Sequence, residues 1–299
     1  VYSTAALSSP KMPHQRERNA IQNECRLAMS GSFRFAVRFA YDGSSYLGFQ
    51  SQPHGNTIQD QIEIRLRGML RRNIRIFGWG RTDTGVHASG AVITVDLTMD
   101  EVTRFSKDEN DDLQQQLKDA ATTLCSAMKE FNCNQRPGSI TATSAVPVPP
   151  NFDPRFSCLW KRYVYYISYG HQNRRSPFLA RFAWQLDQSL DIESMLCAAR
   201  VLNGKHNFQW LSIVEEGELR SPIKTLELTL EKMEGSVFQN DGTTILKVSG
   251  TCDFFLYNMM RRIVGVLVSI GQNRATLSAL ESCLKIQDEE MDGDGQTTC

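Results

Sequence analysis

The sequence lacks a long apolar run. Its longest candidate, Ile263–Ile270, is short and directly follows Arg261 and Arg262, whereas a membrane-spanning helix needs about 20 apolar residues. The sequence therefore excludes a transmembrane segment, and Ile263–Ile270 is expected to belong to a buried helix.

Paired cysteines are also missing. None of the eight cysteines forms a Cys-x-x-Cys pair, and none of the five histidines joins them at the spacing of a metal site. We therefore expect no structural zinc, but reduced thiols in an intracellular protein. The chain begins with Val1 and not with Met, so we expect the natural start, with any transit sequence, to lie outside this sequence. The cytoplasm, the nucleus and an organelle all stay open.

A net charge is absent as well, because Lys and Arg number 33 and so do Asp and Glu. An evenly spread zero would argue against a polyanionic partner, but these charges are grouped. Arg65–Arg81 contains six arginines and no acid, and Arg155–Leu186 contains five arginines, one lysine and no acid. The balancing acids cluster around Asp100–Asp112 and near the end of the chain. The zero is thus a cancellation between blocks.

Each half of the chain shows the same order of elements: strand, helix, two strands, helix. Phe33–Tyr41 alternates apolar and polar residues as a half-buried strand does, and Thr57 with Asp60 forms a capping-box-like start for an amphipathic helix. Pro147–Pro154, with four prolines, is the expected joint between the halves. The other elements are expected at Ile74–Trp79, Ala91–Leu97, Asp112–Glu130, Trp160–Ser168, Leu190–Leu202 with Gly204 as C-cap, Ile223–Glu231, Thr244–Ser249 and Phe255–Ile270.

These patterns predict an α+β chain of two related halves, each with an antiparallel or mixed sheet and helices on one face. Residues 1–31 mix Ser, Pro and charge without an apolar period, and are expected to be a disordered extension. The N-terminal half is expected at 32–150, the C-terminal half at 151–287 and an acidic tail at 288–299.

The segment Gly80–Gly90 is the richest in chemistry, since it places Arg81, Asp83, His87 and three glycines between two expected strands. Glycine lets the backbone approach a bulky ligand, and Arg81 can hold the Asp83 carboxylate ionised, so Asp83 could act as a nucleophile or a base. A plain polar turn explains the same residues, because Asp-Thr-Gly is ordinary turn chemistry. An aspartic protease is excluded, because it needs two such carboxylates and no second Asp-Thr-Gly or Asp-Ser-Gly occurs.

Four ordered segments resemble the TruA-type tRNA pseudouridine synthases over about Phe33–Gly271. Gly80-Arg81-Thr82-Asp83-x-Gly85-Val86-His87-Ala88 resembles the catalytic motif of that family. The other three are Tyr41-Asp42-Gly43-Ser44-x-Tyr46-x-Gly48-Phe49-Gln50, Phe152-x-x-Arg155-Phe156-Ser157 followed by Arg162-Tyr163-x-Tyr165, and Phe255-x-x-x-Met259-x-Arg261-x-Ile263-Val264-Gly265.

The resemblance implies a pseudouridine synthase fold with the active-site cleft between the two halves. It also implies an isomerase that converts uridine to pseudouridine in tRNA, in the anticodon stem-loop, without a cofactor or a metal. Asp83 matches the essential aspartate of the family. Arg81 matches the arginine linked to flipping the target base out of its stack, and Tyr163 matches the tyrosine that stacks on that base. An electropositive cleft around Asp83 is therefore expected.

Further positions match the family with other roles. Arg261 matches a late-helix arginine near the aspartate and is expected to be partly buried and paired with Asp83. His87 is expected to be structural, because it lies four residues beyond Asp83 and enters the next strand. Members of the family are commonly homodimers. Four positions match residues that contact tRNA: Phe152, Arg155, Phe156 and, more weakly, Arg220.

Several of these assignments have plainer alternatives. Tyr163, Tyr165 and Tyr169 alternate on one strand face and would serve as core without any ligand. A lone arginine on an apolar helix is by default a snorkelling surface residue. The arginines of the helix at 57–73 would form a solvated face, although contacts with phosphates are the expectation for a tRNA enzyme.

Of two departures from the family pattern, the missing final strand favours a competing hypothesis, a non-catalytic RNA-binding or RNA-chaperone relative. The acidic insert around Asp100–Asp112 is longer than in compact family members, and the sequence ends in the acidic segment Asp288–Asp294 where a Gly-Leu-rich strand is expected. The intact set of Arg81, Asp83 and Tyr163 argues against that hypothesis and for an enzyme.

Overall fold

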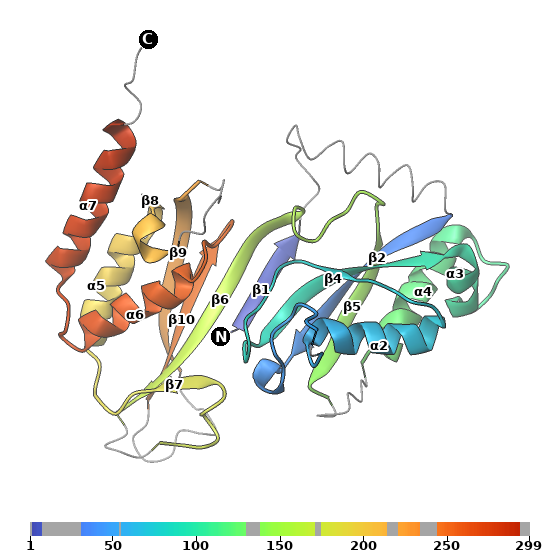
Figure 1. Ribbon diagram of the computed structural model, residues 1–299, viewed down its shortest axis with the longest axis horizontal. Coiled ribbons are helices and arrows are strands. Elements are labelled where there is room, and N and C mark those ends of the chain that lie inside the picture. Colours follow the sequence, from blue (N-terminus) through green and yellow to red (C-terminus); the bar gives the residue numbers. More distant parts are fainter. Residues whose placement is uncertain are drawn as a thin grey trace, which may run out of the picture. The chain divides into compact units, whose positions relative to one another are not determined.

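The computed structural model describes residues 2–7, 31–53, 55–129, 138–170, 175–213, 221–233 and 244–293, with side chains outside 2–7 and 287–293 (Figure 1). The chain divides into two compact units. Of the described residues, those within Ser3–Leu159 form the N-terminal unit, and Tyr2 with those from Trp160 onward form the C-terminal unit. The sequence predicts the boundary in the proline-rich stretch Pro147–Pro154. The two units divide a few residues later, after Leu159, inside a strand.

The N-terminal unit is built on a mixed sheet in the order β5-β2-β4-β1, with β3 also paired to β4. The pairs of β2 with β4 and with β5 are antiparallel, whereas β1 runs parallel to β4 and meets it at Thr4 and Gly90. β1 lies within the segment that the sequence predicts to lack regular structure, and residues 8–30 lie outside the described residues. The strands are β1 (Tyr2–Leu7), β2 (Ser32–Tyr41), β3 (Phe77–Gly78), β4 (Ala88–Thr98) and β5 (Ile140–Val148).

The helices of this unit share one apolar core with the sheet. On β2, Phe35, Val37 and Phe39 are fully buried while Arg38 is exposed, as the predicted alternation requires. Thr57 forms the predicted capping box at the start of the first helix. That core also contains apolar side chains of all three helices, which are α2 (Ile58–Leu70), α3 (Met99–Phe105) and α4 (Leu113–Ala127).

The strand β5 contains the start of the proline-rich stretch. Pro147 pairs with Phe35 of β2, and β5 is the last strand in the sheet order. Proline has no backbone N–H to donate, so an edge strand is where a sheet tolerates it. The sequence predicts no strand at 140–148, because the prolines indicate a joint.

The C-terminal unit has an antiparallel sheet in the order β6-β10-β9-β8, with β7 added parallel to β6. Figure 1 draws α5, α6 and α7 together along one side of these strands. Their apolar faces form the second core with the sheet. The elements are β6 (Cys158–Tyr169), β7 (Ala183–Gln185), α5 (Ile192–Leu202), β8 (Gly204–Asn207), β9 (Ile223–Met233), β10 (Thr244–Cys252), α6 (Met259–Gly271) and α7 (Leu277–Gly293).

Two details at helix ends differ from the sequence prediction. The C-cap of α5 is Asn203, and Gly204, with a φ of +112°, begins β8. The helix α7 continues to Gly293, so the first part of the predicted acidic tail is helical. Leu280 and Leu284, one turn apart, anchor α7 in the core and favour its continuation.

The predicted fold class is confirmed, since both units combine a sheet with helices in an α+β arrangement. The predicted cleft between the halves stays a prediction. Among the residues that the structure describes, no helix has the length and apolar character needed to cross a membrane.

Candidate active site

Asp83 lies in the loop between β3 and β4, and its side chain is exposed. Thr82, directly before it, is 6% exposed and His87, four residues after it, is 1% exposed, whereas Thr84 is exposed. An exposed carboxylate thus sits on a loop whose flanks are packed into the N-terminal unit.

Thr82 fixes the loop on its N-terminal side. Its hydroxyl shares a hydrogen bond of 2.9 Å with the buried Tyr41 hydroxyl, and its carbonyl accepts one of 3.0 Å from the Phe49 amide. Gly48 lies directly against this segment with a φ of +91°, and a Cβ on Gly48 would lie 2.7 Å from the Thr82 carbonyl oxygen. The position therefore requires glycine for its dihedral angle and for the close approach.

A tight turn fixes the loop on the other side of Asp83. The Val86 amide donates to the Asp83 carbonyl at 3.1 Å, and Gly85, the third residue of the turn, has a φ of +77°. This is the geometry of a type II turn, which needs a positive φ at that position. Gly43 packs against the end of the turn so closely that a Cβ there would overlap the Val86 carbonyl oxygen.

His87 completes the support from inside the unit. Its Nδ1 atom lies 3.0 Å from the Asp42 Oδ1 atom. The same carboxylate oxygen accepts from the Ser44 amide at 3.0 Å and from the Ser44 hydroxyl at 2.6 Å, which caps a short 3-10 helix at Gly43–Ser45. Burial beside a turn carboxylate supports the structural role expected for His87.

The arrangement suits a carboxylate that reacts with a bulky substrate. The backbone of Asp83 is held at Thr82 and at Val86, so little reorganisation is needed to present the carboxylate. Its exposure leaves room for a nucleotide to approach, which a buried polar turn would not allow. A nucleophile and a proton acceptor both fit this geometry.

Arg81 is exposed on the same loop. Within the described part of the chain, its guanidinium makes no hydrogen bond or ion pair. The pairing with Asp83 that the sequence suggests is therefore not formed in this structure, and the guanidinium is available to a ligand.

The segment expected to contact tRNA lies at the end of the N-terminal unit. Phe152 is half-buried against the N-terminal core, and Arg34 donates to its carbonyl at 3.1 Å. Arg155 and Phe156 are exposed, and the Arg155 guanidinium lies 5.1 Å from the centroid of the Phe156 ring. Asp153 orients Arg155 through hydrogen bonds of 2.7 and 3.1 Å, which raise the pKa of Arg155. Arg155 and Phe156 thus form a cation and an aromatic ring side by side on the surface.

Tyr163 lies on β6 of the C-terminal unit and is half-buried. Its ring meets that of Phe255 edge to face, with centroids 4.8 Å apart, and its strand partner is Gly250. Tyr165 is also packed against the core of the C-terminal unit, and Tyr169 belongs to that core. The three tyrosines therefore pack as core residues, as the alternative without a ligand predicts.

Arg261 lies in the first turn of α6 and is exposed. The expectation of a partly buried Arg261 is wrong, because the buried stripe of α6 runs through Met260, Ile263 and Val264 and leaves Arg261 beside it. Arg220 lies outside the described residues. Asp83 belongs to one unit and Tyr163 and Arg261 to the other, so their meeting at one site stays a prediction.

The arginines at and after α2 divide into two groups. Three of them are engaged within the fold. Arg72 makes two hydrogen bonds of 2.7 and 2.9 Å to the buried Glu101, Arg75 lies 3.4 Å from Glu63, and Arg65 donates to the last carbonyl of α4. These three stabilise the N-terminal unit.

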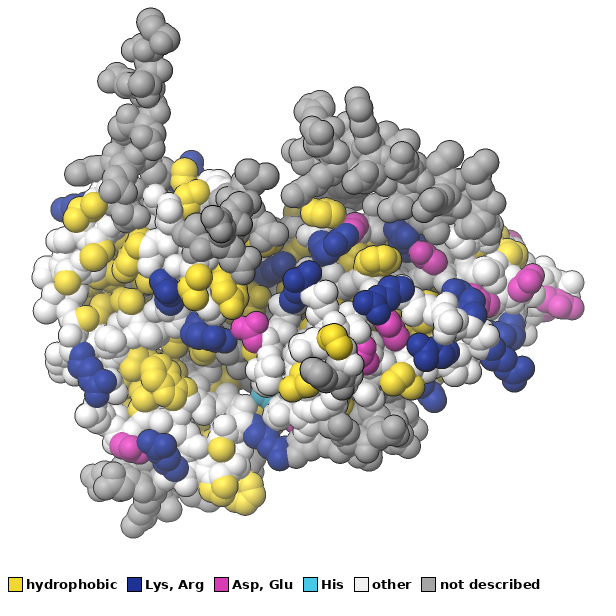
Figure 2. All heavy atoms as spheres, viewed as in Figure 1, with side chains coloured by type: hydrophobic (Ala, Val, Ile, Leu, Met, Phe, Trp, Pro, Cys, Tyr) yellow, Lys and Arg dark blue, Asp and Glu magenta, His cyan; other side chains and the backbone are white. Residues whose placement is uncertain are grey.

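Arg67 and Arg71 differ from the other three. Both are exposed, and neither side chain makes a hydrogen bond or ion pair with a described residue. Together with Arg81 they are the cations of the Arg65–Arg81 block that a phosphate could engage without breaking a contact. The acidic block lies close to this arginine block, since Arg72 pairs with Glu101 of the acidic block, and Figure 2 shows acidic side chains beside Lys and Arg side chains at the end of the N-terminal unit that carries α3 and α4.

The sequence analysis did not predict that Tyr41, Gly43 and Gly48 support the Asp83 loop. It placed them in one segment with a turn, but their contacts with Thr82 and Val86 join positions far apart in the chain. Two glycines spaced by five positions beside an aspartate were the available signal, since a glycine often marks a close approach of two backbones.

Comparisons with known proteins give consistent matches. A family model described as tRNA pseudouridine synthase matches residues 38–157 and 198–295. The chain is 32% identical over 262 residues to the tRNA pseudouridine synthase A of Beijerinckia indica subsp. indica, covering 87% of this chain and 88% of the relative. It is 33% identical over 242 residues to that of Thermosipho africanus, covering 80% and 84%, and 31% identical over 257 residues to that of Paraburkholderia xenovorans, covering 86% and 83%.

Proposed function

Because this chain belongs to the tRNA pseudouridine synthase family, an isomerase family, we propose that Asp83 is the carboxylate with which it converts uridine to pseudouridine in tRNA. The observation that carries the proposal is the loop itself. Asp83 lies in the matched region, exposed between two backbone anchors at Thr82 and Val86. No other carboxylate in the described residues of the Gly80–Gly90 loop competes for the role.

The reaction balances without a co-reactant. The bond between ribose C1′ and uracil N1 breaks, a bond forms between C1′ and C5, and the hydrogen on C5 is replaced by one on N1. Asp83 assists either by attacking the sugar or the base covalently or by taking a proton from the ribose. Both roles require an ionised carboxylate that the substrate can reach.

Reaching a base inside an RNA stem requires flipping it out. Arg81 is suited to this step, because its guanidinium is exposed next to Asp83 and can occupy the vacated stack. Tyr163 is proposed to stack on the flipped base, and Arg261 to lie near the carboxylate. Edge-to-face packing on Phe255 supports the stacking role of Tyr163, since this contact holds the Tyr163 ring in one orientation.

Further surface residues are proposed to hold the rest of the tRNA. Arg155 and Phe156 offer a charge for phosphate and a ring for stacking, and Arg67 and Arg71 offer unengaged cations. The anticodon stem-loop is the proposed target and a homodimer the proposed assembly, both on family resemblance. A tRNA substrate also places the proposed site of action inside the cell.

The test is direct. Unmodified tRNA transcripts are incubated with the protein, and pseudouridines are mapped by carbodiimide-dependent stops of reverse transcription. The proposal expects new stops at defined uridines of the anticodon stem-loop and none in heat-denatured controls. Tight tRNA binding without any stop would instead establish the non-catalytic RNA-binding relative.

A further inference from the structure

Two hollows adjoin on the surface of the C-terminal unit, apart from the residues discussed so far. Their volumes are about 540 and 330 Å³, and they share Arg175, Trp184 and Gln185. The first lies over the loop before β7 and the second reaches the end of α6. Both volumes are in the range of about 300–1,000 Å³ typical of small-molecule sites, so the hollows suit single nucleotides and not a duplex.

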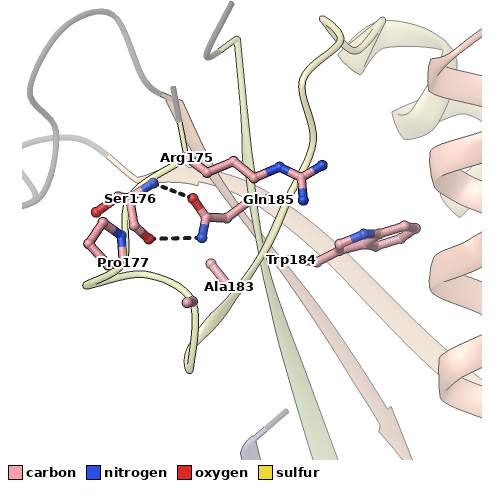
Figure 3. Close-up of a pocket in the computed structure, with 7 residues that line it drawn as sticks. Arg175, Ser176, Pro177, Ala183, Trp184 and Gln185 are labelled. Carbon is pink, nitrogen blue, oxygen red and sulfur yellow. Dashed lines mark hydrogen bonds between the residues drawn. The ribbon is translucent and has the colours of Figure 1, made fainter. Parts of the chain in front are cut away.

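An exposed indole forms the wall between the hollows. Trp184 is 46% exposed, and the nearby Phe178 is 72% exposed, which is unusual for side chains of this size. Figure 3 shows the side chains of Arg175, from the loop before β7, and Trp184, from β7, extending to the same side, whereas the Gln185 side chain turns toward Ser176. The ring face and the cation are thus presented together.

The loop that carries these groups is held in place. The Gln185 amide accepts from the Ser176 amide at 2.7 Å and donates to the Ser176 carbonyl at 2.9 Å (Figure 3). This double hydrogen bond ties the loop to β7. It also occupies the Gln185 side chain, so that group is not available to read the edge of a base.

The charge of the hollows is positive. Arg175 and Arg274 line them, and Asp187 is the one carboxylate among the described lining residues. Asp187 is already paired with Arg175 at 3.0 Å, whereas Arg274 has a hydrogen bond of 3.4 Å to Gln188. Arg274 therefore keeps its charge for an anion.

We propose that these hollows bind one or two unpaired nucleotides of the tRNA, with a base stacked on Trp184 and its phosphate on Arg274 and Arg175. Stacking on an aromatic ring beside a cation is the usual way in which proteins hold unpaired bases without regard to sequence. Since Gln185 cannot read base edges, the site tolerates any base. The proposal rests on the proposed function, which makes the protein a tRNA-binding enzyme.

Tryptophan fluorescence tests the stacking directly. Hexauridylate and hexaadenylate are titrated separately into the full-length protein and into Trp184→Phe. We expect both oligonucleotides to quench the parent protein, and the quenching to fall by the contribution of one exposed tryptophan in Trp184→Phe. Equal quenching of the two proteins overturns the proposal.

Binding of unmodified tRNA tests the energetics. Trp184→Ala should weaken it on the order of tenfold, and Trp184→Phe by less, because Phe keeps a ring. Arg274→Gln should lower the slope of log K against log salt concentration by about 0.7, the value for one phosphate of a single strand. Arg200→Gln removes an exposed arginine of α5 that lines neither hollow, so it is the matched control and should bind like the parent.

The outcomes separate this inference from the proposed function. If the parent protein forms pseudouridine but Trp184→Ala and Arg274→Gln bind tRNA as it does, only the nucleotide site is refuted. If Trp184→Ala converts a dimer to a monomer in sedimentation, and no quenching by either oligonucleotide is seen, the surface is an interface between copies and the proposal fails. If quenching falls in Trp184→Phe as expected while the parent forms no pseudouridine, the site holds and the proposed activity fails.

Discussion

Gly43→Ala is expected to impair catalysis through the backbone of the Asp83 loop. A Cβ at this position would overlap the Val86 carbonyl oxygen, which follows the turn that Asp83 begins. The Cβ position is fixed by the backbone of residue 43, and the oxygen is itself a backbone atom, so neither can rotate away. One chain segment therefore has to move by about 1 Å to restore van der Waals contact.

Two magnitudes follow from that displacement. Overpacking of this kind costs about 1–3 kcal/mol of folding free energy. A reacting group misplaced by about 1 Å loses on the order of 10²-fold in rate. We therefore expect kcat for pseudouridine formation to fall about a hundredfold, with a much smaller change in the affinity for tRNA.

The assay compares initial rates of pseudouridine formation at saturating tRNA, below the unfolding temperature of every variant. Gly55→Ala is the control, because Gly55 lies in the same region with a φ of +67° and nothing within 4 Å of an added Cβ. Unlike Gly43, Gly55 has a positive φ, so alanine there adds backbone strain but cannot push the Asp83 loop. A Gly43→Ala protein with the kcat of the parent would refute the idea that this contact positions Asp83.

The remaining predictions concern charge, strain and stacking. Burial alone would raise the pKa of Glu101, but hydrogen bonds from Arg72 and the Thr98 amide outweigh it and lower that pKa. The stability that this supplies is complete above the ordinary pKa of Glu101 and is lost as the pH falls through its lower value in the folded protein. Arg72→Gln should lower the free energy of unfolding, measured with urea, by about 1 kcal/mol at pH 7 and by much less at pH 3. An equal loss of this free energy at both pH values would contradict the prediction. Arg71 has a φ of +56°, so Arg71→Gly should raise the free energy of unfolding by about 0.5–1 kcal/mol. The same variant should lower the slope of log K for tRNA against log salt concentration by about 0.9, and an unchanged slope would show that Arg71 does not contact RNA. Tyr163→Phe should keep most activity and Tyr163→Ala should lose it, whereas full activity of both in the mapping assay rules out stacking.

The sequence predicted the fold best where one physical pattern dominates. The alternation in β2 and the capping box of α2 are local signals: β2 begins and ends within one residue of its predicted bounds, and α2 begins within one residue of its predicted start but ends at Leu70, three residues before its predicted end. Other elements carry no such signal. β5 contains prolines that indicate a joint, and its strand character depends on the edge position next to β2. Of the strand predicted at Ile74–Trp79, only Phe77–Gly78 pairs with β4.

For the site, the sequence predicted the place of Asp83 but not what holds it there. Its position in a loop between two strands followed from the pattern of glycines and polar residues. The contact of Gly43 with Val86 and the hydrogen bond of Tyr41 with Thr82 arise only when the chain folds. The exposure of Arg261 could not be read from the pattern of α6, since its position borders the buried stripe.

The central claim is that the exposed carboxylate of Asp83 carries the chemistry, and Asp83→Asn tests it most directly. Asparagine keeps the shape of the side chain and removes the charge, so the loop anchors at Thr82 and Val86 are untouched. We predict that this variant unfolds at the temperature of the parent and binds tRNA within about twofold of it, yet forms no pseudouridine in the carbodiimide assay. Measurable pseudouridine formation by Asp83→Asn would contradict the account.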